Sequence, residues 1–121
     1  MIRLLEGFPD SVVAAAATGQ ITRADYDRVL IPRVEAVARD HAKIRCYYEI
    51  GPGFSGMEPG AIWEDVKVGV EYWMRWERVA VVTDVAWIAQ AVHAFRFLMP
   101  GRIRVFPSSE KPAARAWVEA A

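Results

Sequence analysis

The chain has 121 residues and a mass of 13.6 kDa, and 54% of its residues are hydrophobic and 25% charged, which is typical of one folded domain. Fifteen Lys and Arg residues balance fifteen Asp and Glu residues, so the chain lacks the positive charge that a dedicated nucleic-acid-binding protein needs. Its one cysteine, Cys46, excludes an internal disulfide framework and a zinc site built from several cysteines. We therefore expect residues 1–121 to form a single domain with no nucleic-acid partner.

The N-terminal segment and the hydropathy pattern indicate where in the cell the protein is expected. Residues 1–9 contain one basic residue and no apolar run long enough for a signal peptide, and no uninterrupted apolar stretch approaches the ~18 residues of a membrane span. A single cysteine also suits a reducing compartment. We expect a soluble cytoplasmic protein, for which membrane contact would be peripheral.

The first half of the chain predicts a hairpin followed by a helix. Short apolar runs at residues 2–6 and 12–18 end at turn-forming residues, as paired strands do. Thr22 suits a helix N-cap, Asp25 follows three residues later, and apolar residues then recur every three or four positions as far as His41. Pro32 predicts a kink near Ile31, because proline has no amide hydrogen for the helical hydrogen bond.

The second half alternates between strand and helix patterns. Residues 43–50 alternate with one apolar face and predict a strand, and the glycines and prolines of residues 51–60 predict a long irregular loop. Helical spacing follows at residues 61–77, a continuous apolar strand at 79–83, a helix at 85–99 and a strand at 103–106. Ser109 suits the cap of a final helix, with Pro112 in its first turn.

This order, β-β-α-β-α-β-α-β-α, predicts an α/β fold: a single mixed, mostly parallel sheet of about five strands with four helices. Ligands of such folds bind outside the carboxyl ends of the strands, where Glu49 and Asp84 are the polar candidates. A pair of facing carboxylates suits acid-base chemistry, but Asp84 also suits the N-cap of the next helix, which is the structural interpretation we favour.

The motifs of common catalytic and metal centres are missing from the sequence. His41 and His93 are far apart and belong to no metal-ligand motif, and the sequence contains no glycine-rich phosphate loop or nucleophile elbow. Cys46 falls on the apolar face of its predicted strand, where a thiol behaves as a small hydrophobe. The twelve arginines are spread along the chain and indicate surface pairing. We therefore expect no metal, no cofactor and no enzymatic activity.

The two predicted helices at residues 61–77 and 85–99 carry more apolar surface than a sheet can cover. In the second, only Gln90, His93 and Arg96 are polar, although a helix on a sheet needs an apolar arc of only about 100°. Its surplus flank contains Trp87, Ala91, Phe95 and Leu98. The first helix shows two stripes, made of Ile62, Val66, Gly69 and Trp73, and of Trp63, Val70 and Met74, with Trp76 near its end.

Three explanations of this surplus remain open. In the first explanation, the two helices pack against each other as well as against the sheet, which is the usual arrangement. Alternatively they border a pocket or a membrane-facing surface, since apolar and aromatic groups line such sites. They also suit a self-association surface, because Trp, Tyr, Met and Arg are enriched at interface cores.

Several strings, in this order, resemble the SpoIIAA-like family of small bacterial proteins. They are G-Q-I-T-R-A-D-Y-D, V-L-I-P, Y-E-I-G-P-G-F-S-G, A-I-W-E-D-V-K, R-V-A-V-V-T-D-V-A-W, I-R-V-F and A-R-A-W-V. The resemblance covers essentially the whole chain. It implies a fold related to STAS domains and to CRAL-TRIO lipid carriers, and a non-enzymatic module for which membrane association and apolar-ligand binding are suggested.

The leading hypothesis is therefore a module that binds an apolar small molecule or a membrane surface through the two apolar helices. The candidate residues are Phe54, Trp63, Val70, Trp73, Met74, Trp87, Ala91 and Phe95. The alternative is a STAS-type regulatory module that binds a protein partner or forms a homodimer. The STAS resemblance makes Ser55, in G-F-S-G, the nearest candidate for its phosphorylation switch, although the preceding Asp of the D-S-[ST]-G context is missing.

Overall fold

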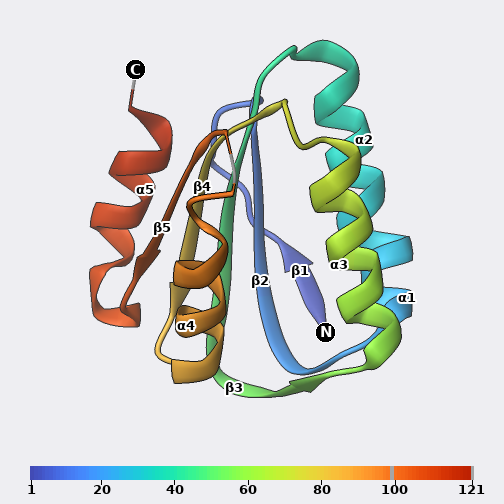
Figure 1. Cartoon of the computed structure of the whole chain (residues 1–121), viewed down its shortest axis with the longest axis vertical. Coiled ribbons are helices and arrows are strands. Elements are labelled where there is room, and N and C mark those ends of the chain that lie inside the picture. The colour runs from blue at the N-terminus through green and yellow to red at the C-terminus, as the bar shows by residue number, and fades with distance from the viewer. Residues whose placement is uncertain (99, 121) are drawn as a thin grey trace.

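In the computed structural model, which describes residues 1–98 and 100–120, five strands form one sheet with helices on both faces (Figure 1). The strands are β1 (Ile2–Leu4), β2 (Val12–Ile21), β3 (Ile44–Met57), β4 (Trp76–Thr83) and β5 (Arg102–Phe106), and they lie in the sheet in chain order. β1 is antiparallel to β2, and every other pair is parallel. The predicted hairpin and the mostly parallel sheet are confirmed.

The helices form two unequal layers. The first predicted helix consists of α1 (Arg23–Asp25), the π-helical turn η1 (Tyr26–Leu30) and α2 (Ile31–Asp40). It is followed by α3 (Pro59–Glu71), α4 (Ala86–Phe95), the 3₁₀ turn η2 (Ser108–Glu110) and α5 (Lys111–Glu119). Residues of η1, α2, α3 and α4 pack into one core cluster, whereas α5 packs on the opposite face of the sheet (Figure 1).

Local chemistry explains how the first helix begins and bends. Thr22 and Asp25 form a capping box, in which the Thr22 hydroxyl accepts from the Asp25 amide at 3.1 Å and the Asp25 carboxylate accepts from the Thr22 amide at 2.9 Å. The irregularity predicted near Ile31 is the π-helical turn, whose last hydrogen bond runs from the Ile31 amide to the Tyr26 carbonyl. Pro32 then falls in the first turn of α2, where its missing amide hydrogen costs little.

The segment predicted to be a long loop, residues 51–60, is mostly strand, so this prediction is wrong. β3 runs through to Met57 because β2 continues beside it, with Gly19 opposite Phe54 and Ile21 opposite Met57. Gly56 has a φ of 137°, a conformation that side chains disfavour, so the glycine permits a bent strand there.

Three other predicted boundaries are also wrong. The helix predicted at residues 61–77 ends at Glu71, and the chain turns before Trp76, which is buried at the start of β4. The helix predicted at 85–99 ends at Phe95, and Met99 lies outside the described residues. Ser109 does not cap α5, because it belongs to the η2 turn and the N-cap position of α5 is taken by Glu110.

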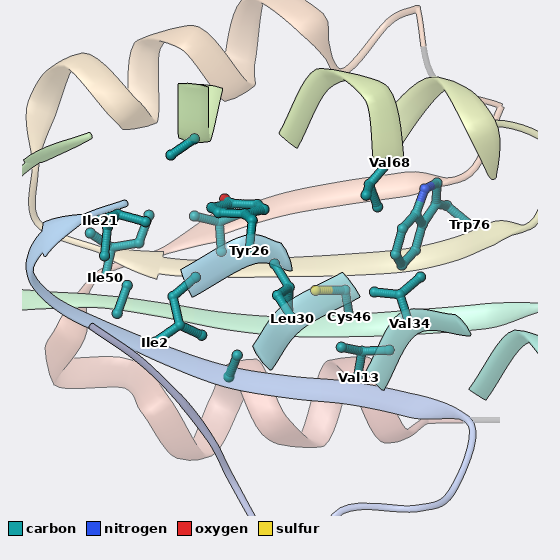
Figure 2. Close-up of a cluster of buried hydrophobic side chains, with 14 of the residues drawn as sticks. Ile2, Val13, Ile21, Tyr26, Leu30, Val34, Cys46, Ile50, Val68 and Trp76 are labelled. Carbon is teal, nitrogen blue, oxygen red and sulfur yellow. The ribbon is translucent and has the colours of Figure 1, made fainter. Parts of the chain in front are cut away.

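The sheet separates two apolar clusters. In the larger one, Tyr26, Leu30 and Val34 point down onto the sheet near Cys46, with Val68 and Trp76 at one end (Figure 2). The smaller cluster lies beneath α5, where Val118 is fully buried. Burial of these side chains is the main favourable term in folding.

Candidate binding surface

The outer face of α3 is apolar, although it points away from the core. Ala61, Glu64 and Val68 are the buried residues of this helix. On the other side, Trp63 is 60% exposed and Val70 65% exposed. We define the α3 apolar face as the exposed residues Ile62, Trp63, Val66 and Val70, together with Met74 just beyond the helix.

α4 has a second apolar surface. Ile88 is its buried residue, whereas Trp87 is 54% exposed and its ring centroid lies 6.2 Å from that of Phe54 on β3. We define the α4 apolar face as the exposed residues Trp87 and Phe95, together with Phe97 and Leu98 in the turn that follows. Isolated exposed apolar residues are ordinary, but nine on two successive helical segments are a concentration that makes these faces the candidate binding surface.

The structure divides the eight predicted site residues into two groups. Exposed are Trp63, Val70, Met74, Trp87 and Phe95, and partly buried are Phe54, Trp73 and Ala91. If α3 and α4 buried their surplus flanks against each other, the first group would be covered. Mutual packing of the two helices therefore does not explain the surplus.

Two hollows of the described surface lie away from the α3 apolar face, and one of them borders the α4 apolar face at Phe97. One is lined mainly by β5 and the turn after α4, and the other by residues near Ser11, Arg45 and Glu119. Neither hollow is lined by a residue of α3. The α3 apolar face is thus part of the outer surface and not the wall of either hollow, whereas the α4 apolar face contributes Phe97 to one of them.

A polar cluster attaches α3 to the sheet beneath the α3 apolar face. The Tyr26 hydroxyl donates to Asp65 Oδ1 at 2.9 Å and lies 3.2 Å from the Tyr48 hydroxyl, so side chains of η1, β3 and α3 meet at one point. Burial raises the pKa of both tyrosines. The pKa of the Asp65 carboxyl is also raised, because the raising effect of the protein packed around it exceeds the lowering effect of the hydrogen bond from Tyr26. Asp65 nevertheless keeps contact with solvent.

The two carboxylates predicted at the ligand edge have separate structural partners. Glu49 accepts from the Tyr47 hydroxyl at 2.7 Å and lies 3.7 Å from Lys111 Nζ. Asp84 accepts from both the amide and the hydroxyl of Ser108, and these two bonds hold its pKa below the usual value. The interpretation of Asp84 as an N-cap is wrong, because the Val85 N-cap position of α4 receives no side-chain cap bond. Glu49, in the middle of β3, is thus linked to α5, and Asp84, just after β4, is linked to η2.

The remaining candidate groups are dispersed. Ser55 is exposed on β3, and α3 begins only at Pro59, so this serine is not at a helix start. Burial raises the pKa of the Cys46 thiol to about 12, which keeps it protonated and unreactive at neutral pH. His93 is exposed on α4. Within residues 1–98 and 100–120, no three His, Cys, Asp or Glu residues are grouped so as to hold a metal ion.

A mixed sheet covered by helices on both faces, with an exposed apolar surface on two of them, defines a small α/β domain suited to binding. The family model named SpoIIAA-like matches residues 12–119, and the chain therefore belongs to the SpoIIAA-like family. Proteins of this family are in general regulatory or binding modules and not enzymes.

A solved structure supports the same fold. The chain is similar to an uncharacterised protein of Shewanella loihica PV-4 whose crystal structure has a SpoIIAA-like fold, with 22% identity and a TM-score of 0.77. The alignment covers 98% of this chain and 92% of the other. Among curated proteins, none matches significantly. No helix in the described part of the chain has the length and apolar character needed to cross a membrane.

Proposed function

We propose that this protein is a non-enzymatic binding domain that attaches peripherally to a lipid bilayer through the α3 and α4 apolar faces. The observation that carries this proposal is the exposure of Trp63 and Val70 on the side of α3 that a soluble helix normally presents as charged. Amphipathic surfaces rich in Trp, Phe and Leu bind at the boundary between headgroups and acyl chains.

The energy available from Trp63 is substantial. A Trp side chain buries up to about 250 Å² and typically about 200 Å², so covering its exposed 60% removes about 120 Å² of surface from water. At about 25 cal/mol per Å², this burial contributes about 3 kcal/mol. The chain has a formal net charge of zero, so long-range attraction adds little and binding by these faces should depend only weakly on salt.

The experiment is flotation with vesicles of phosphatidylcholine. The unmodified chain should float with the vesicles, and a Trp63→Ser, Val70→Ser double variant should remain in the dense fraction. Leu4→Ser is the matched control, because Leu4 is also an exposed apolar residue but lies on β1. Failure of the unmodified chain to float, or equal flotation of all three proteins, would contradict the proposal.

An apolar small molecule is the second ligand class, and the same variants test it. Native mass spectrometry of the purified protein, followed by titration with a fatty acid, shows whether a single molecule binds. If the fatty acid binds and vesicles do not, the apolar faces serve a soluble carrier and the bilayer proposal fails.

The regulatory alternative places partner binding at the end of β3, and the exposure of Ser55 favours it because a kinase could reach the hydroxyl. Phosphorylation would add nearly two negative charges close to the start of α3. The test is a pull-down with the unmodified chain and with Ser55→Glu, followed by measurement of the oligomeric state in solution. This alternative would be favoured if a partner binds only one of the two proteins, or if only one of them forms a homodimer.

A further inference from the structure

The charges of this electrically neutral chain are unevenly distributed. Residues 85–109 contain three arginines and one histidine but no Asp or Glu. A local excess of one sign creates a surface potential even where the whole molecule is neutral.

The fold brings these arginines together at the free edge of the sheet. β5 is the last strand, so only one of its two edges is paired with a neighbour. Beside it lies an open hollow of about 460 Å³, lined by Arg96, Arg102 and Arg104 together with the rings of Phe97 and Trp117. None of the described residues that line this hollow is acidic.

Two of the three arginines, Arg96 and Arg104, lie against aromatic rings and not against carboxylates. The Arg104 guanidinium lies 4.8 Å from the centroid of the Phe106 ring and 5.5 Å from that of Trp117, and the Arg96 guanidinium lies 4.6 Å from that of Phe97. Within the described residues, Arg96, Arg102 and Arg104 form no ion pair. Stacking holds a guanidinium while leaving its N–H donors free for an anion.

Gly101 keeps the chain close to β4 at this point. A Cβ at Gly101 would overlap the Trp76 carbonyl, so a larger residue would push the start of β5 away from the sheet. The close approach places Arg102 opposite Arg78 in the register of β4 and β5. Arg78 itself donates to the Trp117 carbonyl at 2.7 Å and its guanidinium lies 5.5 Å from the centroid of the Trp117 ring, so this arginine helps to hold Trp117 beside the hollow.

We propose that this hollow binds a phosphate ester, whose phosphate contacts Arg102 and Arg104 and whose apolar part lies against Trp117 and Phe97. Guanidinium groups recognise phosphate through paired N–H donors, which explains why arginine and not lysine lines the hollow. A lipid headgroup and a soluble phosphate ester share this chemistry. The site lies apart from the α3 apolar face and does not depend on it.

The test uses two probes and a control variant that removes a positive charge elsewhere on the surface. Binding of phenyl phosphate is measured by calorimetry, and binding to phosphatidylcholine vesicles containing phosphatidic acid is measured by flotation. The Arg102→Gln, Arg104→Gln double variant should lose about tenfold or more in affinity for at least one probe. Arg39→Gln removes a charge from exposed α2 surface and should change neither affinity.

The results distinguish a soluble phosphate ester from a lipid headgroup as the ligand, or they contradict the proposal. Binding of phenyl phosphate that the double variant loses indicates a soluble ester, and loss of only the phosphatidic acid contribution to flotation indicates a headgroup. Binding by this site should weaken as salt is added, unlike binding by the apolar faces. The Trp63→Ser, Val70→Ser variant should retain phenyl phosphate binding, so the two proposals fail separately.

The proposal is wrong if the protein binds neither probe through this hollow. It is also wrong if the double variant and Arg39→Gln lose the same amount of affinity. Charged side chains on an edge strand also prevent sheets from joining edge to edge. If that is their only role, the double variant will self-associate in light scattering while its affinity for both probes stays unchanged, and the proposal is wrong.

Discussion

Replacing Tyr26 by phenylalanine removes one hydroxyl from the cluster that attaches α3 to the sheet, without creating a cavity. The hydroxyl makes a 2.9 Å bond to Asp65 and a 3.2 Å contact with Tyr48. A hydrogen bond to a charged group contributes about 1.5–3 kcal/mol and a neutral one about 1 kcal/mol. Asp65 is in contact with solvent and regains a bond to water in the variant, so we expect a net loss of about 2 kcal/mol.

For a chain of this length, that loss corresponds to a decrease in Tm of about 8 °C. The assay is thermal and urea unfolding followed by circular dichroism at neutral pH. Tyr48→Phe removes only the weaker contact and should cost about 1 kcal/mol. Tyr72→Phe is the matched control, because Tyr72 is half-buried, stacks edge-on with Trp76 and makes no hydroxyl hydrogen bond in the described structure. An equal effect of Tyr26→Phe and Tyr72→Phe would refute the role of the cluster.

Three further predictions concern the stability of the fold. Gly101→Ala should destabilise the protein by about 1–3 kcal/mol in urea unfolding, because its Cβ overlaps the Trp76 carbonyl. The pKa of Asp84 is lowered in the folded state, so its bonds to Ser108 stabilise the fold above the ordinary Asp pKa of about 3.9 and are lost as the pH falls through the lower folded value. Ser108→Ala should therefore weaken the acid dependence of unfolding. The Cys46 thiol, with its pKa raised to about 12, should react with a disulfide reagent only as fast as the protein unfolds.

Each of these predictions has a contrary result. If Gly101→Ala is as stable as the unmodified chain, β4 and β5 can move apart to accommodate the added Cβ without a loss of free energy of unfolding. Identical acid unfolding curves for the unmodified chain and Ser108→Ala would show that the bond from the Ser108 hydroxyl to Asp84 adds nothing to stability. Rapid modification of Cys46 in the native protein, faster than global unfolding, would show that this part of the core opens locally.

Local signals predicted those parts of the fold that local interactions decide. The start of the first helix followed from Thr22 and Asp25, because a capping box involves only neighbouring residues. The irregularity before Pro32 followed from the missing amide of one residue. The element order predicted the parallel sheet, because short alternating strands and helices leave few other topologies.

Features that depend on distant pairing could not be predicted in this way. Residues 51–57 contain glycines and a proline and suggest a loop, but the continuation of β2 supplies hydrogen-bonding partners that turn them into strand. Trp76 fits the helical spacing of the preceding residues, yet it enters β4, where burial decides its place. Tertiary context overrides propensity in both cases.

The candidate site shows the same division. The surplus of apolar residues on two successive helices was visible in the sequence, and the exposure of Trp63, Val70 and Trp87 agrees with it. The arginine hollow was not visible, because Arg96 follows α4 whereas Arg102 and Arg104 lie on β5. The run without acidic residues from 85 to 109 was the signal that could have identified it.

The central claim is that the α3 apolar face contacts the bilayer, and a fluorescent label placed on that face tests it most directly. Because Cys46 is buried and unreactive, a Val70→Cys variant can be labelled at a single site with an environment-sensitive dye. Addition of phosphatidylcholine vesicles should shift the emission of this label to the blue, whereas the same label at Arg39→Cys on α2 should not change. Equal emission from both labelled proteins with and without vesicles would contradict the account.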